Sequence, residues 1–185
     1  MKILAISGSL RAASHNTALL RAAAELAPDG VEFELYENLE ALPPYNEDRD
    51  TDQPPAEVVR LRAAIEDADA VLFATPEYNT TMPGQVKQVV DWASRPRGPA
   101  AALGGKPVAA IGASVTDSGA MWAQDHLRNA LALAGARVLK TELAVAKAQA
   151  RFDTEGRLTD QATRVQLAAL VAELIDHSSP FAVAA

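Results

Sequence analysis

Four polar residues that suit phosphate binding follow the apolar run 3–6: Ser9, Arg11, Ser14 and Asn16. Hydroxyl and amide groups donate hydrogen bonds to phosphate oxygens, and a guanidinium adds a charged, forked donor. A helix-like stretch begins directly after them, and a helix N-terminus contributes backbone N–H groups and the positive end of its dipole. The segment therefore indicates a phosphate site. In a simpler interpretation, Ser14 only caps the helix and Arg11 is a solvated surface residue.

This first polar loop lacks the signatures of two common nucleotide sites. It contains neither the Gly-x-x-x-x-Gly-Lys-[Ser/Thr] pattern of a P-loop nor the Gly-x-Gly-x-x-Gly pattern of an ordinary dinucleotide site. By themselves, these residues do not identify the ligand.

A second polar loop follows a second apolar run, residues 70–74. Its first residues are Pro76, Glu77, Tyr78 and Asn79. In an open parallel sheet, loops that leave the carboxyl ends of strands meet at one edge, where ligands bind. We therefore expect the first and second loops to lie together.

Short runs of β-forming residues alternate with helix-like stretches along the chain. The expected strands are 2–6, 31–36, 70–74, 107–113 and 137–140, and the expected helices are 16–27, 55–67, 84–94, 119–135 and 160–176. This alternation predicts an α/β fold, a doubly wound sheet of five parallel strands with helices on both faces. Residues 31–36 alternate like an exposed edge strand, which suits the flavodoxin-like order 2-1-3-4-5.

Length and composition further limit which classes of protein fit this sequence. A chain of 185 residues suits one domain, which we expect to span 1–177 with a tail at 178–185. No cysteine is present, which excludes disulfides, thiolate nucleophiles and Cys-ligated zinc, so a redox role requires a bound cofactor. The net charge of -7 and the lack of a basic stripe argue against a nucleic-acid partner. We find no apolar stretch suited to a signal peptide or membrane span, and expect a cytoplasmic protein without a membrane partner.

Residues 38–54 form a long connection without a hydrophobic period. Connections of this length are often lids or interface elements, but a solvated, mobile excursion explains the composition equally well. The sequence leaves both interpretations open.

With their spacing, the two loops resemble those of the NADPH-dependent FMN reductase family, which includes chromate and quinone reductases and related azoreductases. The resemblance rests on residues 8–16, on Pro-Glu-Tyr-Asn with Pro83-Gly84 after it, and on Asp91, Trp92, Ser94 and Arg95. It extends to residues 42–48, 124–128 and 152–158, and so covers nearly the whole chain.

The resemblance implies FMN as cofactor and assigns a place to each matching residue. The phosphate would be held by the segment that contains Ser9, Leu10, Arg11, Ser14 and Asn16. The isoalloxazine ring would be lined by Pro76, Glu77, Tyr78 and Asn79. Ser114, after the fourth strand, would be a third contact, although 115–118 precede Gly119 where many family members have glycines soon after the serine.

The resemblance also implies a ping-pong hydride transfer from NADPH or NADH through FMN to a small acceptor such as a quinone, an azo compound, chromate or free flavin. No residue is required as an acid or base, and Tyr78 and Asn79 would orient the flavin and the acceptor. Arg49, Arg95 and Arg97 are candidates for a 2′-phosphate contact. Family members are typically homodimers, so we expect a homodimer with two FMN, and a tetramer remains open.

Two other functions fit the same fold. A flavodoxin-like carrier would pass single electrons between proteins, but such carriers usually place aromatics from two loops around the flavin, and Tyr78 is the only aromatic in the three loops. A flavin-free binding domain is the second alternative.

Several other residues have a simpler interpretation than catalysis. The three histidines, His15, His126 and His177, are too far apart in sequence to show a metal-ligand spacing, so we expect surface or packing roles and no metal. Glu77 is expected to cap backbone N–H groups or to contact a partner subunit. Asp91 and Arg95, one helical turn apart, suit a surface ion pair.

Overall fold

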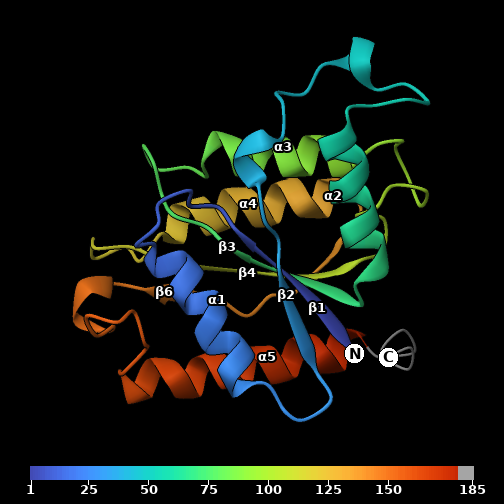
Figure 1. The fold of residues 1–185 in the computed structure, drawn as a ribbon. Coiled ribbons are helices and arrows are strands. Elements are labelled where there is room, and N and C mark those ends of the chain that lie inside the picture. Colours follow the sequence, from blue (N-terminus) through green and yellow to red (C-terminus); the bar gives the residue numbers. More distant parts are fainter. Residues whose placement is uncertain (179–185) are drawn as a thin grey trace.

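The computed structural model describes residues 1–178, which form a parallel sheet between two layers of helices (Figure 1). The strands are β1 (Lys2–Ser7), β2 (Glu32–Leu35), β3 (Ala70–Ala74), β4 (Pro107–Ala113), β5 (Arg137–Val138) and β6 (Leu143–Val145). The helices are α1 (His15–Leu26), α2 (Ala56–Asp67), α3 (Gly84–Ala93), α4 (Met121–Leu133) and α5 (Gln161–Ser178). The strand order β2-β1-β3-β4-β5 confirms the predicted topology.

The fifth position of the sheet differs from the prediction of one strand over 137–140. The short β5 pairs with the start of β4, and β6 pairs with the end of β4 at Ile111, Gly112 and Ala113. Leu139 still donates a backbone hydrogen bond to the Val108 carbonyl, after which the chain leaves the sheet and returns as β6. The prediction missed β6 because three residues are too few to show a period.

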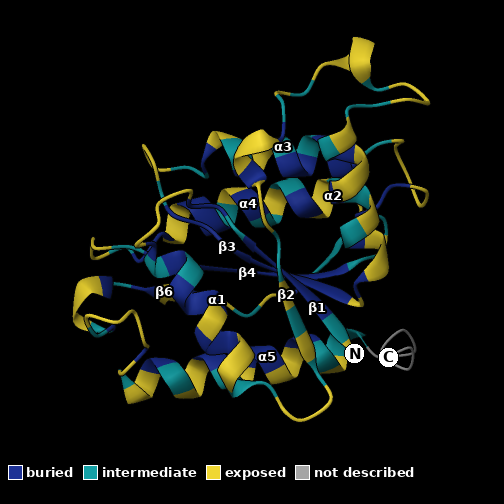
Figure 2. Ribbon diagram, viewed as in Figure 1, coloured by how far each residue is buried: buried dark blue, intermediate teal, exposed yellow. Residues whose placement is uncertain are grey.

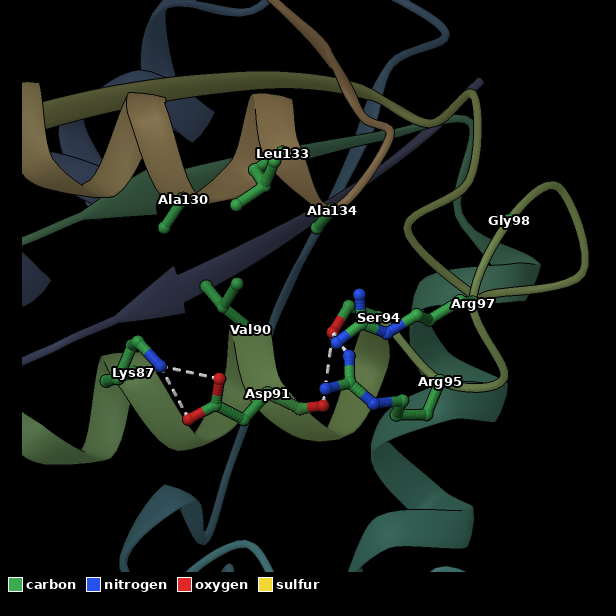
Figure 3. A pocket seen from close by; sticks show the side chains of 10 residues that line it. All are labelled: Lys87, Val90, Asp91, Ser94, Arg95, Arg97, Gly98, Ala130, Leu133 and Ala134. Carbon is green, nitrogen blue, oxygen red and sulfur yellow. Dashed lines mark hydrogen bonds and ion pairs between the residues drawn. The ribbon is translucent and has the colours of Figure 1, made fainter.

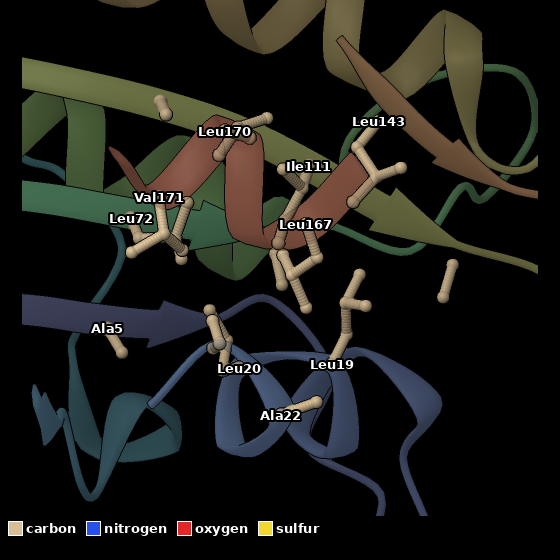
Figure 4. Packing of buried hydrophobic residues seen from close by; sticks show 14 of the residues in the cluster. Ala5, Leu19, Leu20, Ala22, Leu72, Ile111, Leu143, Leu167, Leu170 and Val171 are labelled. Atoms are coloured by element: carbon tan, nitrogen blue, oxygen red, sulfur yellow. The ribbon is translucent and has the colours of Figure 1, made fainter. Parts of the chain in front are cut away.

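Alternate residues of the central strands point into two separate cores. Ile3 and Ala5 of β1 pack under α1 and α5, whereas Leu4 and Ile6 pack under α2, α3 and α4. Figure 4 shows leucines of α1 and α5 meeting over the first of these faces. Strands β3 and β4 are buried throughout, whereas the edge strand β2 is half exposed, as its alternating sequence predicts (Figure 2).

The helix ends follow the local signals of the sequence. Ser14 is the N-cap of α1, and Gly30 and Gly135 take the left-handed backbone that follows α1 and α4, with φ of 85° and 91°. Ser178, expected to begin the tail, is instead the last residue of α5, and residues 179–185 lie outside the described residues. Among the helices of residues 1–178, none is long and apolar enough to cross a membrane.

The long connection at 38–54 is packed at its base and exposed at its tip. Leu39 and Leu42 are buried, the Trp92 indole N–H donates to the Pro43 carbonyl at 2.8 Å, and Asp50 pairs with Arg62 at 2.7 Å. Residues 46–53 are mostly exposed, and in Figure 1 they extend away from the helical layer as a cyan arm. We call residues 46–53 the arm.

Candidate functional site

The first loop, residues 8–14, leads from β1 into the N-terminus of α1. Ser14 accepts a hydrogen bond from the Thr17 N–H at 3.2 Å, so its capping role is confirmed. The first turn of α1 contains no acidic residue. The exposed Arg11 guanidinium contacts only the Ala13 carbonyl of its own loop, at 3.3 Å, among the described residues. This set of donors suits a phosphate.

Gly8 brings the first loop against the second. A side chain at this position would place its Cβ 2.4 Å from Cγ2 of Val86 and 3.1 Å from Cδ of Pro76. The Gly8 N–H also donates to the Ala74 carbonyl at 2.8 Å. Only glycine permits this approach, which places the two loops side by side as the topology predicts.

Asn16 uses its side chain inside the protein. Its Nδ2 donates to the Ala113 carbonyl at 3.0 Å, and the Ala113 N–H donates to its Oδ1 at 2.9 Å. The residue is 3% exposed. In the described structure both polar atoms of the amide therefore join α1 to the end of β4, a partner that sequence spacing did not reveal.

The second loop, residues 75–83, contains a tight hairpin. Tyr78 and Thr81 exchange two backbone hydrogen bonds, of 3.0 and 3.2 Å. The two residues between them, Asn79 and Thr80, have φ of 51° and 62°. Two consecutive left-handed residues in a two-residue hairpin are typical of a type I′ turn, which normally prefers Asn followed by Gly. The branched Thr80 is strained there.

Glu77 caps the N-terminus of α4, which is one of the two roles expected for it from the sequence. Its Oε2 accepts hydrogen bonds from the N–H groups of Trp122 and Ala123, at 3.0 and 3.2 Å. Its Oε1 accepts a longer bond from Ser118 at 3.4 Å. A carboxylate at a helix N-terminus also interacts favourably with the helix dipole.

A second contact joins the same loop to α4. His126 Nδ1 and Thr81 Oγ1 share a hydrogen bond of 2.8 Å. From the sequence we expect only a general surface or packing role for His126, because no spacing connects it with Thr81, 45 residues earlier.

The third loop, residues 114–120, is held by a chain of hydroxyl groups. Ser114 contacts Thr116 at 2.9 Å, Thr116 contacts Ser118 at 2.9 Å, and Ser118 reaches Glu77. The Ser114 carbonyl also accepts from the Ala148 N–H at 2.9 Å. These contacts give shape to the loop at residues 115–118, which precede Gly119.

A pocket of about 490 Å³ lies between the first and second loops. It is lined by Gly8, Leu10, Arg11, Tyr78, Pro83, Gly84 and Gln85. Leu10 is 53% exposed and Tyr78 is 49% exposed, although both are large and apolar in part. Ser9 and Leu10 also border a smaller pocket of about 210 Å³. The structure thus brings together Leu10, Arg11 and Tyr78, whereas Asn16 and Glu77 are committed to structural contacts.

A separate pocket of about 240 Å³ lies between α3 and α4 (Figure 3). Here Asp91 pairs with Lys87 at 2.6 Å, and Arg95 instead donates to Ser94 at 2.9 Å, so the predicted Asp91–Arg95 pair is wrong. Lys87 is one turn before Asp91 on the same helix face. Arg95 and Arg97 line this pocket rather than the one between the loops.

Arg11 places a positive charge near His15, the first residue of α1. Partial burial, and secondarily the positive charge of Arg11, lower the pKa of His15 at the start of α1. The His15 ring lies 5.2 Å from the ring of Phe152, at a tilt of 33°. An anion bound here would therefore be attracted by Arg11 and would favour protonation of His15.

Within the described chain, no group of three or more His, Cys, Asp or Glu residues could hold a metal ion. The site consists instead of hydroxyl, backbone and guanidinium donors next to a half-apolar pocket. Such a set suits a phosphorylated ligand with a flat ring system. With the flavodoxin-like sheet, it defines the class of the protein as a cofactor-binding α/β protein whose site lies at the carboxyl ends of the strands.

Comparison with known proteins gives the family. The NADPH-dependent FMN reductase family model matches residues 1–150. A Pseudomonas aeruginosa NAD(P)H-dependent FMN reductase is 46% identical over 165 residues, covering 89% of this chain and 88% of the relative. A 2-hydroxy-1,4-benzoquinone reductase of a Burkholderia species is 41% identical, covering 90% of each chain.

A solved structure agrees with these relatives. The flavoenzyme FerB of Paracoccus denitrificans, an NAD(P)H:(acceptor) oxidoreductase, superimposes with a TM-score of 0.85 at 36% identity, covering 96% of each chain. The chain belongs to the NADPH-dependent FMN reductase family. It is an oxidoreductase with FMN as cofactor and a nicotinamide nucleotide as electron donor.

Proposed function

We propose that this protein is an NAD(P)H-dependent quinone reductase in which donor and acceptor use one pocket in turn, a ping-pong order. The observation that carries the proposal is the pocket between the first and second loops, where Arg11 lies close to an exposed apolar rim. The names of the relatives support a quinone as acceptor, since they include a benzoquinone reductase and a quinone reductase of Pseudomonas putida. Azo compounds, chromate and free flavin are further acceptors to assay.

In this proposal the residues of the protein bind FMN and orient it. Ser9, Arg11, Ser14 and the free N–H groups at the start of α1 would hold the phosphate of FMN. Leu10 and Tyr78 would border the ring, and the hairpin at Asn79 would set its position. Bound FMN would supply the hydride chemistry, so no side chain is required to remove a proton. Protons for a reduced quinone can come from water in a pocket this exposed.

We further propose a homodimer that works in the cytoplasm. Leu133 is 93% exposed and Trp122 is 50% exposed, and both lie on the outer side of α4. Large apolar side chains exposed on one helix are typical of a subunit interface. The arm extends from the body, which suits a contact with a second subunit. A measured molar mass of two or four chains distinguishes a dimer from a tetramer, and a single chain contradicts both.

One experiment tests the enzyme against its alternatives. Purified protein is mixed with FMN, freed from excess and examined by visible spectroscopy, and NADPH or NADH is then added without oxygen. We expect bound flavin absorbance that bleaches with the nucleotide and returns on addition of a quinone. Retained flavin that neither nucleotide bleaches would indicate an electron carrier. Protein that retains no flavin would indicate a flavin-free domain and overturn the site.

A further inference from the structure

The hairpin of the second loop needs support from outside. A left-handed backbone is unfavourable for a branched side chain such as that of Thr80, and both Asn79 and Thr80 adopt it. Strained backbone of this kind persists only where surrounding contacts over-determine it. The hairpin contributes its own Tyr78–Thr81 backbone pair, and the remaining support must come from neighbouring elements.

Helix α4 provides that support at two points. Glu77, just before the hairpin, is fixed on the N–H groups of the first turn of α4. Thr81, at the other end of the hairpin, is fixed by His126, about one turn further along the same helix. The hairpin is therefore held at both ends by one rigid element.

We propose that His126 is a positioning residue for the FMN site, acting through Thr81. The backbone pair between Thr81 and Tyr78 transmits this constraint to Tyr78, which lines the pocket. Releasing Thr81 would let the turn relax and move Tyr78 from the position that a ring requires. This inference rests on the proposed role of the second loop in holding FMN.

The chemistry of the contact makes it suitable for a permanent support. A threonine hydroxyl both donates and accepts, so it can accept from a protonated Nδ1 and donate to an unprotonated one. The hydrogen bond can therefore form with either tautomer of the His126 ring.

Two substitutions separate positioning from a merely structural role. Asparagine carries a polar atom at the δ position, like His126 Nδ1, whereas the polar atoms of glutamine lie one bond further out. We expect His126→Asn to retain FMN affinity and His126→Gln to weaken it by about fivefold, the effect of one neutral hydrogen bond. Helix propensity alone favours Gln over Asn and predicts the opposite order.

A double-mutant cycle tests whether His126 acts through Thr81. Thr81→Val removes the hydroxyl and keeps the shape, so Thr81→Val, His126→Ala and the double variant should each weaken FMN binding by about the same fivefold factor. FMN affinity is measured by quenching of flavin fluorescence. Gln166→Ala, at an exposed position of α5, is the control for an unrelated helix substitution.

A second measurement needs no flavin. In FMN-free protein, hydrogen exchange of the Tyr78 and Thr81 amides should accelerate in His126→Ala and His126→Gln, and not in His126→Asn. Equal behaviour of the Asn and Gln variants, or independent effects in the cycle, would overturn the proposal. Faster exchange with unchanged FMN affinity would also overturn it. Failure of the unsubstituted protein to bind FMN refutes the proposed site itself, while the exchange data still decide whether His126 supports the hairpin.

Discussion

The amide of Asn16 is bonded in both directions to the backbone of Ala113, which lies 97 residues away in the sequence. This contact joins the helix after the first loop to the strand before the third loop. Two of the three loops at the site are thereby held in one unit. The family resemblance placed Asn16 among the phosphate-binding residues, and the structure gives its side chain a positioning role in the same site.

Asn16→Ala should therefore destabilise the FMN-free protein. The substitution removes two hydrogen bonds and leaves buried backbone groups of Ala113 without partners, at a cost of about 2–3 kcal/mol in the free energy of unfolding. Asn16→Asp should cost more, because its carboxylate replaces the donor that faces the Ala113 carbonyl. Urea unfolding without FMN measures both. Weaker FMN binding at unchanged stability would instead indicate a direct phosphate contact through the side chain.

Arg11 should contribute to FMN binding and little to folding. Its guanidinium is exposed and contacts only its own loop within the described residues, so Arg11→Ala should leave the free energy of unfolding nearly unchanged. FMN affinity should fall by about tenfold. This is the lower end of the range for losing a hydrogen bond to a charged group, because solvent screens the exposed guanidinium. Riboflavin, which lacks the phosphate, is the control ligand and should bind both proteins equally. An equal loss for riboflavin would place Arg11 against the ring instead.

Glu77 should act as a helix cap. Glu77→Ala removes the acceptor for two N–H groups of α4 and should cost about 1–2 kcal/mol of stability, in the range of other N-cap losses. Glu77→Gln retains an acceptor oxygen and should cost less than half of that. Thermal unfolding gives the comparison. A loss of kcat of about 10²–10⁴-fold in Glu77→Gln at normal stability would instead indicate an acid–base role.

Relief of strain at Thr80 should stabilise the protein. Thr80→Gly produces the Asn-Gly pair that type I′ turns prefer and removes a left-handed threonine, for a gain of about 1 kcal/mol. Thr51→Gly is the matched control, because Thr51 is exposed in the arm and its φ is not positive, so glycine there adds flexibility and removes the hydrogen bond that Thr51 Oγ1 accepts from the Gln53 N–H. The two variants should change the melting temperature in opposite directions. A lower melting temperature for Thr80→Gly would show that the turn is unstrained.

His15 should make the FMN-free protein less stable in acid. Its pKa in the folded protein is lowered from 6.5 by partial burial and by Arg11, so the unfolded chain binds the proton more tightly. Stability is then fully present above pH 6.5 and is lost as the pH falls through the folded pKa. His15→Gln should flatten this part of the pH–stability curve. FMN should oppose the loss, because its phosphate favours the protonated imidazole. An unchanged curve in His15→Gln would contradict the assignment.

Much of the fold could be predicted because local signals agree with the topology. The apolar runs of β1 and β3, the cap at Ser14 and the glycines after α1 and α4 each depend on a few neighbouring residues. The pairing of polar loops with strand ends also follows from sequence order in a parallel sheet. The short β6 was missed because its existence depends on pairing with the end of β4 rather than on its own three residues.

The sequence by itself determined which kinds of groups lie on the loops at the strand ends: hydroxyls, Arg11 and Tyr78. Only the tertiary structure decided which atoms remain free for a ligand. Asn16 and Glu77 have the right chemistry for a cofactor, yet their polar atoms are used by Ala113 and α4. No spacing in the sequence connects His126 with Thr81, to which it is hydrogen-bonded. Hydrogen bonds act over about 3 Å, so partners distant in the chain are set by packing and not by spacing.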